Sequence, residues 1–161
     1  AVGMMGQQAE NERDIQAATR VMRSNYEGPA SILAVLASRF EERGSGTLVG
    51  ISSVAGDRGR ATNYVYGSAK AGFTAFLSGL RNRLAKHGVH VVTVLPGFVA
   101  TKMTEDMDLP AKLTAQPSEV AEAIARAVER KKDVIYVRAV WRLIMLIIRN
   151  IPERVFKGMK I

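Results

Sequence analysis

The sequence of 161 residues predicts a single α/β domain built on a doubly wound parallel sheet. Two short apolar runs rich in β-branched residues, 47–51 and 89–95, have the composition of strands that are buried on both faces. Segments with helical periodicity lie before, between and after these runs, which indicates crossover connections and therefore parallel strands. In such a sheet ligands bind at the carboxyl ends of the strands, so the residues after 51 and 95 are the first candidates for a site.

The elements are separated by turn and helix-end signals. Gly44-Ser45-Gly46 precedes the first strand, Gly88 ends the long helix before the second strand, and Pro96-Gly97 ends that strand. A polar segment with weak periodicity, 102–116, is a candidate substrate lid. The expected elements are, in order, helices on either side of a break at Gly28-Pro29 within 10–43, a strand 47–51, a helix 63–86, a strand 89–95, a helix 117–130 and a strand 133–137.

Composition limits the kind of function. With no Cys and only two His, the chain has no disulfide framework and no thiolate metal site, so we expect no metal. The net charge of +8 suggests an anionic partner, either nucleic acid or a membrane surface. No aromatic-basic stacking motif or recognition helix supports nucleic acid. Without a leader pattern or an apolar run near ~18 residues, we expect a cytoplasmic protein, with membrane association left open.

Three residues carry the candidate chemistry. Tyr66 and Lys70 are four residues apart, so on a helix they share a face, and a nearby cation favours the phenolate form of Tyr. Taken alone, this spacing also fits a surface Lys beside a half-buried Tyr. Ser53 lies at the tip of a predicted strand, 13 residues before Tyr66, while alternation along the strand turns Ser52 to the opposite side, where we expect a structural role.

The order of these residues resembles the classical short-chain dehydrogenase/reductase family. In that family the motifs come in a fixed order: a strand that ends in Ser, a glycine-containing segment, Tyr-x-x-x-Lys, and Pro-Gly-x-x-x-Thr after the next strand. The same order occurs here, with Ser53, Tyr66 and Lys70, and the segment 96–101. The resemblance implies a Rossmann-like fold and an NAD(P)-dependent oxidoreductase that transfers hydride between nicotinamide and a carbonyl or secondary alcohol. It implies that Tyr66 is the general acid/base, that Ser53 holds the substrate oxygen, and that Lys70 lowers the Tyr pKa and binds the nicotinamide ribose.

The resemblance also extends to residues around the proposed cofactor. Asn25 matches an Asn-x-x-Gly pattern in which the family's Asn anchors a water of a proton relay; alternatively, its amide satisfies backbone groups at the helix break. For the loop after the second strand, the resemblance implies that the backbone near Val99 contacts the nicotinamide carboxamide and that Thr101 reaches the cofactor phosphates. Alternatively, Pro96-Gly97 is a plain turn signal. The implied cofactor-binding residues are Tyr66, Lys70, Pro96, Gly97, Val99 and Thr101.

The family's Gly-x-x-x-Gly-x-Gly turn, which brings the cofactor pyrophosphate to a helix N-terminus, does not occur in this sequence. We expect it upstream, within ~90 residues of strand-helix units, and we interpret Ala1-Val2-Gly3 as the remnant of the family's Asn-Ala-Gly segment. The chain on its own is therefore expected to bind NAD(P)H poorly, and the sequence does not decide between NAD and NADP.

The C-terminal segment has a different character. We assign 1–137 to the catalytic portion and 138–161 to a basic amphipathic tail, in which Arg142 and Arg149 flank a six-residue apolar run. This tail packs against its own domain, contacts another subunit, or makes peripheral membrane contact through 139–161. With 56–60, it resembles bacterial reductases of a decaprenylphosphoryl keto sugar, which implies a lipid-linked or other small-molecule carbonyl/alcohol substrate.

Two further expectations concern assembly and an alternative function. By resemblance, a homodimer or homotetramer forms through the helices 28–43 and 63–86. The alternative to catalysis is a non-catalytic, basic membrane-associated or oligomerisation protein on the same fold.

Overall fold

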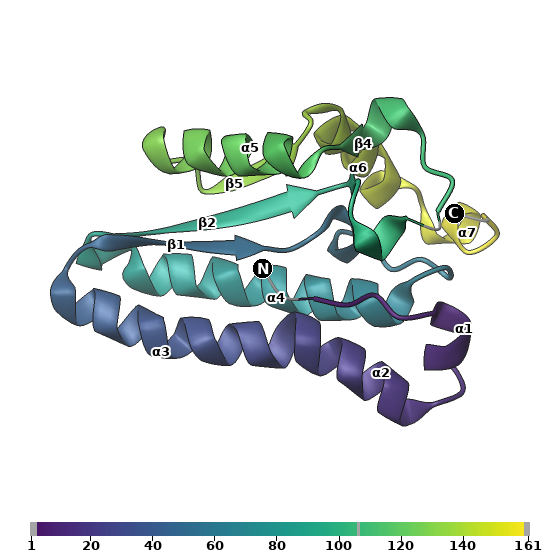
Figure 1. The fold of residues 1–161 in the computed structure, drawn as a ribbon, viewed down its shortest axis with the longest axis horizontal. Helices are drawn as coiled ribbons and strands as arrows, with labels where there is room; N and C mark the ends of the chain where they lie inside the picture. The colour runs from purple at the N-terminus through teal and green to yellow at the C-terminus, as the bar shows by residue number, and fades with distance from the viewer. Residues whose placement is uncertain (1–2, 106, 160–161) are drawn as a thin grey trace.

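The computed structural model describes residues 3–105 and 107–159. Ala1 and Val2 of the expected Asn-Ala-Gly remnant, and the last two residues of the expected tail, lie outside the described residues. The described chain has three layers (Figure 1): helices α3 (Gly28–Arg43) and α4 (Tyr64–Leu84) cover one face of a sheet, and α5 (Pro117–Glu129) covers the other.

The central sheet confirms the expected doubly wound α/β class. Its strands β1 (Gly46–Ile51), β2 (Val89–Pro96) and β5 (Val134–Val137) are parallel and lie in the order β1-β2-β5. All carboxyl ends therefore meet at one edge, where β2 ends at Pro96 beside Val137. A second, two-stranded parallel sheet joins β3 (Phe98–Val99) to β4 (Thr114–Ala115) beyond that edge.

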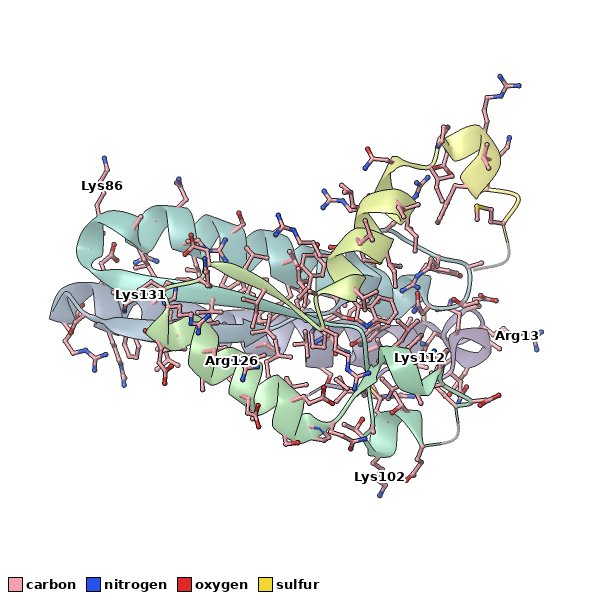
Figure 2. All side chains as sticks on the ribbon, turned by 90° about the horizontal axis from the view of Figure 1, so that it is seen from above. Arg13, Lys86, Lys102, Lys112, Arg126 and Lys131 are labelled. Atoms are coloured by element: carbon pink, nitrogen blue, oxygen red, sulfur yellow. The ribbon has the colours of Figure 1, made fainter. Side chains whose placement is uncertain are left out.

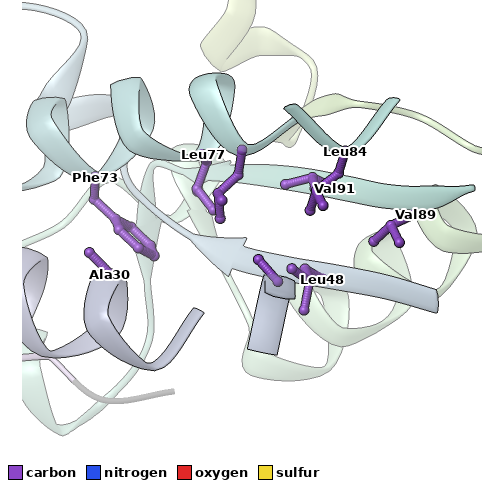
Figure 3. Packing of buried hydrophobic residues seen from close by; sticks show 9 residues of the cluster. Ala30, Leu48, Phe73, Leu77, Leu84, Val89 and Val91 are labelled. Carbon is purple, nitrogen blue, oxygen red and sulfur yellow. The ribbon is translucent and has the colours of Figure 1, made fainter. Parts of the chain in front are cut away.

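The core between α4 and the sheet is made by leucines and valines (Figure 3). Leu77 and Leu84 of α4 are fully buried against Leu48 and Val91 of the strands. Gly50 allows this close approach, because a Cβ there would overlap the side chain of Leu77. The packing fixes α4, and with it Tyr66 and Lys70, against the end of β1.

The N-terminal helices differ from the expected helix, break, helix. After α1 (Gln8–Asn11), the helix α2 (Ile15–Met22) continues through a π-helical turn, η1 (Arg23–Glu27), directly into α3. Pro29 has no N–H for the carbonyl of Asn25, and the Gly28 N–H bonds five residues back to Arg23. The prediction of a break at Gly28-Pro29 is therefore wrong, since the chain absorbs the proline in a π-turn.

The remaining elements surround the carboxyl edge of the sheet. Short 3₁₀ turns follow β1 and α4, namely η2 (Val54–Gly56) and η3 (Ala85–His87). The expected lid, 102–116, contains η4 (Lys102–Thr104), η5 (Ala111–Leu113) and β4. The chain continues into α6 (Val140–Asn150) and α7 (Glu153–Phe156). Among the described residues, no helix is long and apolar enough to cross a membrane.

Candidate active site

The structure brings Ser53 and Tyr66 together at the end of β1. Ser53 caps the turn η2, and its hydroxyl accepts a hydrogen bond from the N–H of Ala55 at 3.1 Å. Two glycines allow η2 to lie against α4: a Cβ at Gly56 would stand 2.7 Å from the N of Ala71, and one at Gly67 would stand 2.8 Å from the O of Ala55. This close packing holds the Ser53 hydroxyl beside the phenol.

Burial controls the ionisation of Tyr66. Desolvation raises its pKa above the ordinary value, and the interaction with the Ser53 hydroxyl lowers it only in part. The expectation of a lowered Tyr66 pKa does not hold in the structure, because burial is the largest influence and raises it. At neutral pH the phenol therefore carries its proton, the form that donates to a carbonyl oxygen.

Lys70 is a buried cation. Its side chain is only 6% exposed, and Nζ donates to the carbonyl of Ile51 at 3.1 Å. The ammonium lies 5.7 Å from the centre of the Tyr66 ring, so the two residues share a face of α4 as expected. Burial lowers the pKa of Lys70 from 10.5 to about 8. Holding a charge here costs stability, which is typical of a functional site.

Ser52 has the structural role expected for it. Its hydroxyl lies 3.0 Å from the carbonyl oxygen of Lys70 and 2.6 Å from the hydroxyl of Thr74, and its side chain is buried. It therefore ties the end of β1 to the middle of α4.

Asn25 lies inside the π-turn η1 and is 1% exposed. Its Nδ2 donates to the carbonyl oxygens of Met4 at 2.6 Å and Val21 at 2.9 Å, as the alternative of backbone satisfaction requires. Its Oδ1, however, is buried with no hydrogen-bond partner within 3–105 and 107–159. A Cβ built on Gly3 would stand 2.8 Å from this oxygen and 4.0 Å from Lys70 Nζ. Asn25 Oδ1 and the ammonium thus border the same small space.

A cleft of about 540 Å³ joins these side chains to the loop after β2. Of the candidate residues it is lined by Asn25, Tyr66, Lys70, Pro96, Gly97, Val99 and Thr101. Ser53 does not line it and reaches it through Tyr66.

The loop after β2 is shaped by tertiary contacts that the sequence pattern does not reveal. Any Cβ on Gly97 would overlap the indole of Trp141, which packs edge-on against Phe98 with ring centres 5.2 Å apart. The Val99 carbonyl accepts a hydrogen bond from the Thr104 hydroxyl at 2.6 Å, and the side chains of Thr101 and Thr104 cap the turn η4. The 96–101 segment is thus held by α6 and η4, and is more than a plain Pro-Gly turn.

Methionines surround the mouth of the site, a feature that we did not single out from the sequence. A hollow of about 720 Å³ adjoins Tyr66 and is lined in part by Met4, Met5, Met103 and Met107. Met side chains adapt to apolar ligands of irregular shape. They come from the N-terminal segment and from the expected lid, and only the fold brings these two segments together.

The fold and this cluster define a class: a doubly wound α/β protein with a Ser–Tyr–Lys centre at the carboxyl ends of its parallel strands. Comparison with known proteins gives the family. The chain belongs to the short chain dehydrogenase family, whose sequence model matches residues 1–112.

Related proteins extend the match over nearly the whole chain. It is 42% identical over 159 residues to an oxidoreductase of uncharacterised function from Mycobacterium tuberculosis, covering 99% of this chain and 64% of that protein. It is 38% identical over 155 residues to a similarly described oxidoreductase from Streptomyces coelicolor, covering 96% of this chain and 61% of that protein. The chain thus spans less than two thirds of the length of these relatives.

A solved structure gives the same fold. A short chain dehydrogenase from Burkholderia cenocepacia, crystallised in complex with NADP, superposes with a TM-score of 0.80 at 24% identity, over 94% of this chain and 62% of the other.

Proposed function

We propose that this protein is an NAD(P)-dependent oxidoreductase that reduces a carbonyl group or oxidises the corresponding secondary alcohol. The observation that carries the proposal is that Tyr66 and Lys70 line one cleft, with the Ser53 hydroxyl beside the Tyr66 phenol. The names of relatives as oxidoreductases, and the crystallisation of structural neighbours with NADP and NADPH, support it.

Tyr66 is the proton donor in this proposal. Its raised pKa keeps the phenol protonated at neutral pH, so in the reducing direction it gives a proton to the carbonyl oxygen as hydride arrives at carbon. Ser53 donates a hydrogen bond to the same oxygen and stabilises the charge that develops on it. In the oxidising direction Tyr66 accepts the alcohol proton.

The residues on the far side of the cleft fit a nicotinamide nucleotide. When bound, the nicotinamide supplies or accepts the hydride. Lys70 and Tyr66 present an ammonium and a hydroxyl suited to the ribose, and the segment from Pro96 to Thr101 is the candidate contact for the carboxamide and phosphates. Asn25 Oδ1, which has no hydrogen-bond partner in the described part of the chain, is an acceptor suited to a water that carries the proton onward.

We propose that a glycine-rich strand-helix unit preceding Gly3 completes the cofactor site. Two observations support it. The outer edge of β1 has no paired strand in the described residues and borders an apolar groove of about 570 Å³, lined by Ile32, Leu33 and Val49 among others. The chain also covers only 64% of its relative from Mycobacterium tuberculosis.

The site favours a substrate that carries an apolar group beside its reactive carbonyl. The four methionines at the mouth provide an adaptable apolar surface next to Tyr66. This favours a lipid-linked substrate, of which the keto sugar on a decaprenyl phosphate carrier is the specific proposal. We further propose a homodimer or homotetramer formed through α3 and α4, because Val35 of α3 is largely exposed.

A second candidate is a membrane-associated protein without catalysis. The observation that favours it is the exposed apolar face of α6, where Leu146 and Ile147 face solvent. The two candidates are separated by turnover, since membrane contact alone predicts none.

Replacement of Tyr66 by Phe in the full-length protein tests the catalytic proposal, with Tyr64→Phe as the matched control. Tyr64 lies on the same helix, is 46% exposed and does not line the cleft. We expect Tyr66→Phe to lower kcat by a factor of ~10² to 10⁴ while nucleotide binding and folding persist, and Tyr64→Phe to leave kcat unchanged. Retained turnover in Tyr66→Phe would refute the assignment.

A further inference from the structure

Helix α6 is apolar on both of its faces. Trp141 and Met145 are buried against Val54 and Leu95 of the body of the domain. The opposite face is also apolar: Leu143, Leu146 and Ile147, at the i, i+3, i+4 spacing of one helical face, are 59%, 60% and 59% exposed. A surface helix ordinarily turns polar residues outward, so this face indicates a binding surface.

Basic residues border this apolar face. Arg142 and Arg149 are seven residues apart, which places them along the same edge of the helix, and both are exposed. The described part of the tail, 138–159, contains five basic residues and one acidic residue, Glu153. That carboxylate is already paired with Arg58, at 2.9 Å. Figure 2 shows α6 and α7 projecting from the layered body of the molecule.

We propose that α6 docks on the surface of a bilayer that contains anionic lipids. In this arrangement Leu143, Leu146 and Ile147 enter the headgroup-acyl boundary, and Arg142 and Arg149 reach the lipid phosphates from the edge of the helix. The charge argues against a second copy of the chain as the occupant, because pairing two such faces brings four arginines together in a protein of net charge +8. An anionic surface is complementary to both parts of the face.

The docking surface is rigidly connected to the candidate active site. Nη1 of Arg58 donates to the carbonyl oxygens of Ile148 and Ile151, each at 2.6 Å, and thereby caps the C-terminal end of α6. The same guanidinium stacks on the ring of Phe156, 3.6 Å from its centre. Arg58 follows Ser53 by five residues, so docking of α6 holds the cleft at a fixed position relative to the bilayer.

Docking of α6 on a bilayer stands on the geometry of the helix alone. Only its link to a lipid-linked substrate rests on the proposed function.

Binding of the protein to vesicles is measured by co-sedimentation, with vesicles of phosphatidylglycerol and phosphatidylcholine compared with vesicles of phosphatidylcholine alone. The variant is Leu146→Glu/Ile147→Glu, and the matched control is Ile15→Glu/Met22→Glu on α2, whose side chains are 79% and 44% exposed. Far-UV circular dichroism and the fluorescence of Trp141, the single tryptophan, report whether each variant folds.

We expect the wild type to bind the anionic vesicles, and to bind them more weakly when salt is added. Binding is expected to fall at least tenfold in the α6 variant and to stay unchanged in the control variant. Arg142→Gln and Arg149→Gln each reduce binding about fivefold, from about 1 kcal/mol per basic residue near an anionic surface. Vesicle binding that is absent in the wild type, or equal in the folded α6 variant, would overturn the proposal. If the α6 variant instead turns a dimer into a monomer in sedimentation without any vesicle binding, the occupant is a second copy. Vesicle binding needs no turnover, so its failure is distinguishable from failure of the reductase proposal.

Discussion

Replacing Lys70 by Met is expected to make the protein more stable and catalytically inactive. The side chain is 6% exposed, and burial lowers the pKa of Lys70 from 10.5 to about 8. That difference corresponds to about 3 kcal/mol of unfavourable free energy for keeping the ammonium charged in the folded chain. Met fills a similar volume without a charge, but loses the hydrogen bond to the Ile51 carbonyl, worth about 1 kcal/mol. The net expectation at pH 7 is a gain of about 2 kcal/mol.

The sign of the pH dependence follows from the lowered pKa. Between pH 8 and 10.5 the folded wild type has released the Lys70 proton while the unfolded chain still holds it, so this group makes wild-type stability rise with pH. Below pH 8 its full cost is present. The stabilisation in Lys70→Met is therefore largest below pH 8, and it disappears as the pH rises toward 10.5.

Urea denaturation followed by Trp141 fluorescence, at pH 7 and at about pH 10.5, measures this difference. Lys86→Met, in the exposed turn η3 that follows α4, is the control. A stabilisation that is independent of pH, or a Lys70→Met variant that is less stable than wild type at pH 7, would refute the reasoning. Loss of turnover in the stabilised variant would show that the buried ammonium is kept for function.

Two other substitutions test how the site is supported. Arg58→Ala removes the guanidinium donor to the carbonyl oxygens of Ile148 and Ile151, of which Ile148 keeps only the N–H of Ile151. We expect the free energy of unfolding to fall by about 1–3 kcal/mol in urea denaturation, a loss that Arg58→Lys does not fully restore. An unchanged midpoint would contradict the capping role. Gly97→Ala places a Cβ on the indole of Trp141, and we expect it to destabilise the fold by about 1–3 kcal/mol in thermal unfolding. Gly79→Ala is the control and is not expected to destabilise the fold, because its added Cβ meets no described atom within 4 Å. Equal effects of the two substitutions would argue against the close contact at Gly97.

The sheet and the Tyr66–Lys70 pair were predictable because they depend on local patterns. The expected strands 47–51, 89–95 and 133–137 agree with β1, β2 and β5 within one residue or so, since apolar β-branched runs between turn signals leave few alternatives. The spacing of Tyr66 and Lys70 fixes their shared face on α4 in the same way.

The features that the sequence did not reveal depend on long-range contacts. The π-turn at Asn25 was predicted as a break, because Pro29 allows either outcome and tertiary packing selects one. The expected lowering of the Tyr66 pKa was wrong because burial, which sequence spacing does not measure, raises this pKa more than the Ser53 hydroxyl lowers it. Trp141 beneath Gly97 and Arg58 at the end of α6 join residues far apart in sequence, so no local signal indicated them.

The most direct test of the central claim is NADH and NADPH binding and oxidation, with a carbonyl substrate, by the full-length protein and by residues 1–161 alone. The account predicts that the full-length protein binds and oxidises one of the two nucleotides and that the shorter chain binds it far more weakly. It also predicts that Tyr66→Phe slows oxidation by a factor of ~10² to 10⁴ without loss of binding. Absence of nucleotide binding by the full-length protein would contradict the assignment as a reductase.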